Sequence, residues 1–334
     1  MVDDYVQYRR SLKLVAGDAT GNGLDLSNLR IVFTVTHAIV GQMPKSLEAR
    51  IYNPAPQTVS RLQREFSQVS LEAGYSGHVA ELFRGSIVQS RYVRDNPTDT
   101  YLAILATEAD KTYSEATINT VIGAGWSHED AANSYLQAVD DAQLKNVILP
   151  KTDTTGCRPK ICYGMVREHT RILGHSTNTN WAVNGNNLAF YPLGGASAPL
   201  QGENDEVVAL TPATGLIGMP QQITGGVSAQ CLLNPRLQAG KRVMINLSDI
   251  IAARADVSYT AGANPNLVSG DSPNAINNPN VSGSQFAGLS QSGNYRIQFV
   301  DHSGDTRGND WSSSITCTAL DATSVLPTSL LRAG

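Results

Sequence analysis

Four residues near the middle of the chain carry side chains that can bind a metal ion. They are Cys157, Cys162, His169 and His175, spaced C-x4-C-x6-H-x5-H. Thiolates and imidazoles are the ligands that tetrahedral zinc prefers. The gap of six residues is short beside the roughly twelve of a zinc-finger pattern. A zinc site is therefore one interpretation, and free thiols, or a disulfide if oxidised, is the other. The short gap favours the second, so we assign no metal ligands.

Other catalytic and cofactor motifs are missing from the sequence. No G-x-S-x-G elbow occurs, Gly240-Lys241 lacks the rest of a P-loop, and no G-x-G-x-x-G follows a strand. Asp140 and Asp141 are adjacent, and neighbours on a helix do not converge on a substrate as a glycosidase pair does. The remaining histidines share no spacing, so each can be structural as easily as a base. They are His37, His78, His128 and His302. The sequence thus predicts no catalytic residue and no cofactor.

The elements that would position such groups are mostly strands. Residues 293–320 predict one long β-hairpin, because apolar side chains recur at every second position on both arms. The polar loop 303–310 joins the arms. Tyr295, Phe299 and Trp311 could form a stacking platform for a base or sugar, but at strand spacing beside Ile297 and Ile315 core packing is favoured.

The remaining chain divides by its periodicity. Residues 10–53 predict strands, 56–69 a helix, and 101–106 a strand buried on both faces. Helices are predicted from Ser114, over 128–144 with Ser127 as its cap, and over 166–173. A hairpin follows at 181–191, with Asn184-Gly185 as a type I′ turn. Residues 194–204 predict a linker, 206–247 strands, and 254–292 a long loop rich in Asn, Ser, Gly and Pro.

Composition indicates a folded protein that neither coats nucleic acid nor spans a membrane. The 334 residues are 41% hydrophobic and 16% charged, with 29 Gly and 15 Pro, which suits a turn-rich β protein. The formal net charge of -4 argues against a nucleic-acid-coating protein. The start is charged, and no run of about 18 apolar residues occurs, so we expect no signal peptide and no membrane span. Four cysteines do not make a disulfide scaffold, which indicates assembly in a reducing cytosol.

Two stretches carry a family resemblance. Residues 293–320 resemble the closing hairpin of baseplate hub proteins of contractile-tailed phages, the late-control family related to the N-terminal part of type VI secretion spike proteins. Residues 215–247 are similar to the hub segment in which a strand containing Gly and Pro leads to an apolar strand, an Asn-Pro turn and a further apolar strand. In that family the closing hairpin returns beside this segment.

The resemblance implies a mainly β fold with an α+β insert. Two tube-like antiparallel β-barrel domains, 1–106 and 199–334, would be separated by a helix-rich insert at 107–198. It also implies a structural role without enzymatic activity. Three chains would supply six barrels to a pseudo-hexameric ring that joins the six-fold tail tube to the three-fold spike and lets DNA pass. Loop 254–292 does not match the family and is a candidate contact to a neighbouring baseplate protein.

The same resemblance implies partners and a location. We expect a homotrimer in the virion tail baseplate, assembled in the host cytoplasm. Its partners would be the central spike protein, tail tube or tube-adaptor proteins, baseplate wedge proteins and the tape measure protein, without membrane contact or specific nucleic-acid binding. Two alternatives stay open. A tail-associated cell-wall hydrolase would need a paired Glu/Asp site or a Cys-His cleft. A distal-tail or tube-completion barrel protein would form six copies.

Overall fold

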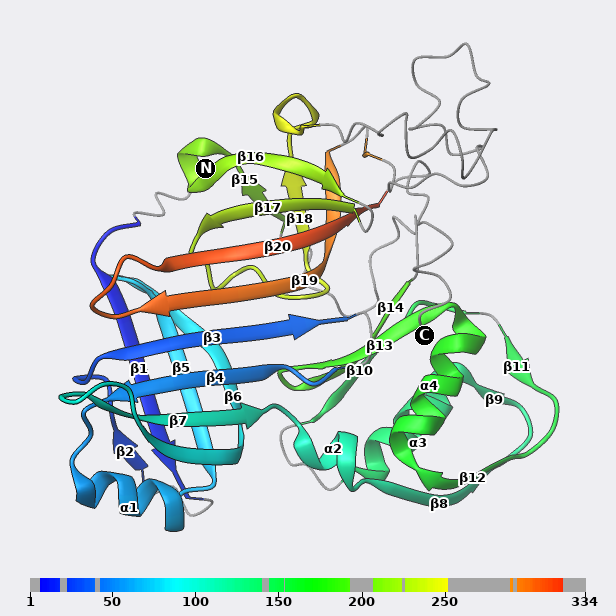
Figure 1. The fold of residues 1–334 in the computed structure, drawn as a ribbon. Helices are drawn as coiled ribbons and strands as arrows, with labels where there is room; N and C mark the ends of the chain where they lie inside the picture. The colour runs from blue at the N-terminus through cyan, green and yellow to red at the C-terminus, as the bar shows by residue number, and fades with distance from the viewer. Residues whose placement is uncertain are drawn as a thin grey trace, which may run out of the picture.

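The computed structural model describes residues 7–18, 23–39, 43–139, 144–152, 154–192, 207–223, 226–251, 289–290 and 293–320 (Figure 1). The predicted linker 194–204 lies outside the described residues. So does the predicted loop 254–292, apart from 289–290. Asp140 and Asp141 are also outside them.

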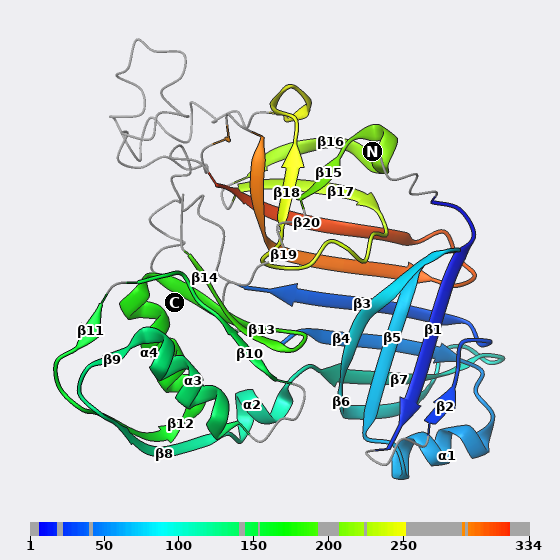
Figure 2. The ribbon, with the colours of Figure 1, turned by 180° about the vertical axis from the view of Figure 1, so that it is seen from behind.

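The first part of the chain, here called the first β-module, is built of strands with one helix. Its elements are β1 (Arg10–Gly17), β2 (Gly23–Asp25), β3 (Ile31–Ala38), β4 (Ser46–Tyr52), α1 (Pro56–Arg64), β5 (Gln68–Tyr75), β6 (His78–Arg94) and β7 (Thr100–Thr107). In Figures 1 and 2, β1 and β5 lie across β3 and β4, so the sheet folds over on itself. The enclosed core joins both layers, with Leu14 and Leu71 on one side and Phe33 and Ile104 on the other.

The middle of the chain, here called the insert, holds most of the helix. Its elements are α2 (Asp110–Ser114), β8 (Thr117–Ile122), β9 (Trp126–Ser127), α3 (His128–Ala138), β10 (Asn146–Ile148), β11 (Thr155–Gly156), β12 (Lys160–Met165), α4 (Val166–Thr177), β13 (Thr179–Asn184) and β14 (Asn187–Pro192). Its own hydrophobic cluster includes Tyr135, Leu173, Trp181 and Phe190. No helix among the described residues is long and apolar enough to cross a bilayer.

The last part, here called the second β-module, returns to strands. It contains β15 (Val207–Leu210), the 3-10 turn η1 (Pro212–Thr214), β16 (Leu216–Ile223), β17 (Gly226–Leu232), β18 (Arg242–Ile245), η2 (Leu247–Asp249), β19 (Asn294–Asp305) and β20 (Trp311–Ala319). A separate core includes Val227, Ile245, Ile297 and Ile315. β20 pairs with β17 in antiparallel register and β19 pairs with β18, so the closing hairpin returns beside segment 215–247 as expected.

One sheet runs through both β-modules in the order β16-β17-β20-β19-β3-β4-β7-β6-β5-β1-β2. The seam is the antiparallel pair β3–β19, in register from Phe299↔Ala38 to Asp305↔Val32. The expected mainly β fold with a helix-containing insert is confirmed. The insert separates the two modules along the chain only, because in space they pair strand to strand. The boundaries proposed at 106/107 and 198/199 stay a prediction.

The structure corrects three helix predictions. Helix α1 ends at Arg64, and Val69 lies in β5, where backbone pairing with β1 at Ala16 replaces helical bonding. The helix predicted from Ser114 is strand β8, whose residues pair with β12. Helix α3 ends at Ala138 rather than at residue 144, although its predicted capping box between Ser127 and Asp130 is confirmed.

Three strand predictions also change. The run 101–106 is buried on one face only, because Leu105 is 40% exposed while Leu102 and Ile104 are buried. A bulge at Gln298 shifts the phase of β19, so Phe299 does not share the face of Tyr295 and Ile297. The 181–191 hairpin exists, but its turn is Gly185-Asn186, and only Gly185 has positive φ, so it is not type I′.

Candidate functional site

Hydroxyl side chains form rows across the outward face of the sheet, over the seam between the β-modules. The register aligns Thr34, Ser303 and Ser312 in one row, and Thr36, Asp301 and Ser314 in the next. These residues alternate along each strand with buried ones, so they point away from both cores. We call the set the hydroxyl face; it comprises Thr34, Thr36, Ser228, Gln230, Asp301, Ser303, Ser312, Ser314 and Thr316.

Hydrogen bonds cross the strands of the hydroxyl face. Thr36 Oγ1 donates to Asp301 Oδ1 at 2.9 Å, which joins the first β-module to the second. Ser303 Oγ lies 3.3 Å from Ser312 Oγ on the other arm of the hairpin. Gln230 Nε2 extends the network to β17, 3.5 Å from Ser312 Oγ. These short polar side chains form hydrogen bonds to one another across the strands, so the face is polar and its side chains are held in place.

The hydroxyl face carries a single formal charge, that of Asp301. The adjoining strand β4 continues the row with Glu48, whose carboxylate pairs with Arg50 at 3.0 Å. A surface without unpaired cations does not release counterions from a polyanion, so it gives nucleic acid little to bind.

The four residues weighed as zinc ligands are not gathered into a metal site within the part of the chain that the structure describes. Cys157 is exposed and Cys162 is buried on β12, and both are free thiols. His169 Nε2 lies 3.1 Å from the Tyr163 carbonyl oxygen, and His175 is in the last turn of α4. Among the described residues no group of three or more His, Cys, Asp or Glu could hold a metal ion.

The aromatic residues considered as a stacking platform are core residues or lie in the sheet. Trp311 is 3% exposed and meets Phe33 edge-on, with ring centroids 5.6 Å apart. Tyr295 is fully buried. Phe299 is half-buried within the row of Ala38 and Thr316. The expected core packing is therefore confirmed for Trp311 and Tyr295.

Two of the histidines are held neutral inside the molecule. Burial first, and then the charge of Lys45, lowers the pKa of His37 to about 3. The same two causes lower the pKa of His302 to about 3. Both groups are buried beneath the sheet rather than open to a cleft, which fits a structural role.

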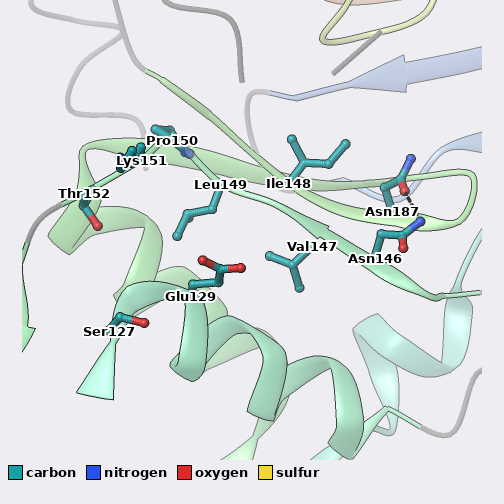
Figure 3. A pocket seen from close by; sticks show the side chains of 10 residues that line it. All are labelled: Ser127, Glu129, Asn146, Val147, Ile148, Leu149, Pro150, Lys151, Thr152 and Asn187. Carbon is teal, nitrogen blue, oxygen red and sulfur yellow. Dashed lines mark hydrogen bonds between the residues drawn. The ribbon is translucent and has the colours of Figure 1, made fainter. Parts of the chain in front are cut away.

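A cavity of about 570 Å³ lies in the insert, between the start of α3 and strand β10 with its continuation (Figure 3). Glu129 faces the apolar side chains of Val147 and Leu149, and Asn146 Nδ2 donates to Asn187 Oδ1 at 3.1 Å. Among the described residues that line it, Glu129 is the only carboxylate. These residues therefore lack the carboxylate pair that a glycosidase uses.

Sequence reasoning missed the hydroxyl face as a continuous surface. Alternation along residues 295–300 predicts one mostly polar face on the first arm of the closing hairpin. The sequence did not reveal that Thr34 and Thr36, more than 260 residues away, continue it, because the pairing of Thr36 with Asp301 spans 265 positions.

No protein-family model and no curated protein sequence matches the chain. Solved structures do match its fold. The tail protein of Neisseria meningitidis MC58 superposes with a TM-score of 0.52 at 10% identity, over 93% of this chain and 96% of that chain. The 43 kDa tail protein of prophage MuSo2 from Shewanella oneidensis gives 0.50 at 9% identity, over 94% and 99%.

A third structure extends the comparison to secretion systems. It is the E. coli c3393 protein, described as a component of the type VI secretion system with structural similarity to the bacteriophage T4 tail proteins gp27 and gp5. It gives a TM-score of 0.52 at 10% identity, over 95% of this chain and 79% of that chain. The chain thus has the fold of phage tail proteins, and the resemblance drawn from residues 215–247 and 293–320 is confirmed at the level of fold.

Proposed function

We propose that the chain is the structural hub of a contractile tail baseplate. Three copies form a ring in which the six β-modules imitate six-fold symmetry, joining the tail tube to the three-fold spike. The fold shared with tail proteins and with a type VI secretion component supports this assignment. The single observation that carries it is the continuous sheet through two β-modules, each with its own core.

The geometry gives a reason for the ring. Two modules that pair through β3 and β19 place two β-walls side by side within each chain. Three such chains present six walls, and closed symmetry covers the two ends of the sheet, at β16 and β2. The role is structural, without catalysis, and its partners are the spike, the tail tube or its adaptor, the wedge proteins and the tape measure protein.

The hydroxyl face lines the lumen of this ring. It extends across both modules, so three chains together supply a polar wall around the whole channel. Because it bears no cation, DNA passes along it without being held. The protein therefore resides in the virion tail, after assembly in the host cytoplasm.

Electron microscopy of the purified protein tests the proposal. We expect ring-shaped particles with three-fold symmetry, six lobes and an open centre. Compact particles without a central opening would contradict a hub. Rings with true six-fold symmetry would instead favour a distal-tail or tube-completion protein.

A further inference from the structure

A second cavity, of about 510 Å³, lies where the two β-modules and the insert meet. We call it the junction cavity. Its polar lining comes from all three parts of the chain: Lys45 and Glu108, Asn184 and Asn187, and Gln238 and Lys241. None of these side chains belongs to the hydroxyl face.

The walls of the junction cavity are fixed by hydrogen bonds between the three parts. Glu108 Oε1 accepts the backbone N–H of Gly185, at the tip of the β13–β14 hairpin, at 2.9 Å. Asn184 Nδ2 donates to the carbonyl oxygen of Ala239 in the second β-module at 3.1 Å. The hairpin tip is thus held from both sides, which makes the cavity preorganised rather than a gap between mobile parts.

The ammonium of Lys45 is the unusual group in this cavity. Lys45 is 9% exposed, and its Nζ lies 3.9 Å from Glu108 Oε2, an ion pair too long to be a hydrogen bond. Within the described residues, its ammonium makes no hydrogen bond. An ammonium has three donors, and those of Lys45 are available to the cavity that this residue lines. An oxygen-bearing group in the cavity would satisfy them.

The charges around the cavity leave a positive excess. Glu81, which also lines it, accepts from Arg84 Nε at 2.8 Å. Glu108 is engaged by Lys45 and Gly185. The remaining cation, Lys241, faces no further carboxylate among the described lining residues. The space therefore favours a negatively charged occupant.

We propose that the junction cavity binds a small oxyanion, such as a phosphate or a carboxylate group, between Lys45 and Lys241. The side-chain amides of Asn187 and Gln238 line the same space and can donate to its oxygens. A bound oxyanion would tie the insert to both β-modules at one point. This site does not depend on ring assembly or on the proposed hub role.

Calorimetry and thermal unfolding of the full-length protein with inorganic phosphate, and separately with acetate, test the site. We expect at least one of the two anions to bind and to raise the Tm in proportion to its concentration. Lys241→Met should weaken anion binding about tenfold or more, because it removes one charge-assisted hydrogen bond. The double variant Lys45→Met/Glu108→Gln removes the buried pair together, so it keeps the fold while weakening binding similarly.

The matched control is Lys13→Met, which removes a cation that is 55% exposed on β1, outside the cavity. It should bind the anion as the unchanged protein does. Phosphate binding identifies a free phosphate as the ligand class, and acetate binding alone identifies a carboxylate. The proposal is overturned if neither anion binds, or if all three variants bind with equal affinity.

Discussion

His302 and Ser313 face each other across the closing hairpin, with Nδ1 and Oγ 2.7 Å apart inside the second β-module. On its other side, His302 Nε2 lies 3.1 Å from the carbonyl oxygen of Leu237, so this nitrogen must carry the hydrogen. Nδ1 therefore accepts from the Ser313 hydroxyl, which itself accepts from the N–H of Asn234 at 3.1 Å. The neutral imidazole thus links the hairpin to the segment that follows β17.

This network predicts a loss of stability in mild acid. The pKa of both His302 and His37 is lowered to about 3 in the fold, so below the ordinary value of 6.5 the unfolded chain binds more protons. Stability that is present above about pH 6.5 should fall by about 1.4 kcal/mol per pH unit for each histidine as the pH drops toward 3. Urea unfolding at about pH 7 and about pH 5 measures this slope.

A histidine variant distinguishes the contribution of the two histidines to the pH dependence of stability from that of the carboxylates. His302→Gln should reduce the slope between about pH 6.5 and 5, where carboxylates contribute little. His78→Gln, at an exposed position, should leave it unchanged. A slope unaffected by His302→Gln would show that the buried imidazole does not control the acid response.

Gly226 should not tolerate a side chain. Its φ is +140°, and a Cβ there would overlap the carbonyl oxygen of Cys317 on the paired strand β20. Gly226→Ala should therefore destabilise the fold by about 2–4 kcal/mol through backbone strain and displacement of β20. At Gly123 an added Cβ would meet no atom within 4 Å. Gly123→Ala should therefore change the free energy of unfolding by no more than about 0.5 kcal/mol in the same denaturation assay. Equal stability of the two variants would disprove the close approach.

The ion pair between Arg30 and Asp305 should contribute to joining the β-modules. Arg30 Nη2 and Nε donate to the two carboxylate oxygens at 2.7 and 3.3 Å, and this bonding is the largest cause of the lowered pKa of Asp305. Because Arg30 is 43% exposed, we expect Asp305→Asn to lower the free energy of unfolding by only about 1–2 kcal/mol. A double-mutant cycle with Arg30→Met should show a coupling of about 1 kcal/mol.

An exposed ion pair is the control for this cycle. Glu48 and Arg50 are 54% and 49% exposed, so Glu48→Gln should change stability by less than about 0.5 kcal/mol. A coupling near zero for Arg30 and Asp305 would mean that strand pairing alone holds the modules together.

Placing cations on the hydroxyl face should create DNA binding. Ser314 and Gln230 are exposed, so the double variant Ser314→Lys/Gln230→Lys should fold normally. It should retard double-stranded DNA in gels at low salt, with binding that weakens as salt rises, whereas the unchanged protein should not. Gln57→Lys/Ser60→Lys in α1 adds the same charge away from this face. If the unchanged protein binds DNA as tightly as the hydroxyl-face variant does, the claim that the hydroxyl face does not hold DNA is wrong.

Local patterns in the sequence predicted most of the individual elements. Alternation identified β1, β3, β4 and both arms of the closing hairpin, because each has one face on a core and one face toward water. The Ser127–Asp130 capping box located the start of α3, since that signal depends only on residues three positions apart.

Features that depend on distant residues could not be predicted in this way. The seam between β3 and β19 joins segments about 265 positions apart, and no local pattern encodes it. Arg296 is buried although it lies on the face opposite Tyr295 and Ile297, because it donates to the Gly240 carbonyl oxygen at 2.8 Å and stacks over the Tyr191 ring. Residues 117–122 look helical by spacing, yet pairing with β12 makes them a strand.

The mass of the purified protein in solution tests the central claim most directly. Light scattering at micromolar concentration should give three times the 35.7 kDa of one chain, since the ring requires three copies that each supply two β-modules. A particle of one chain, or of six, would contradict the trimeric hub.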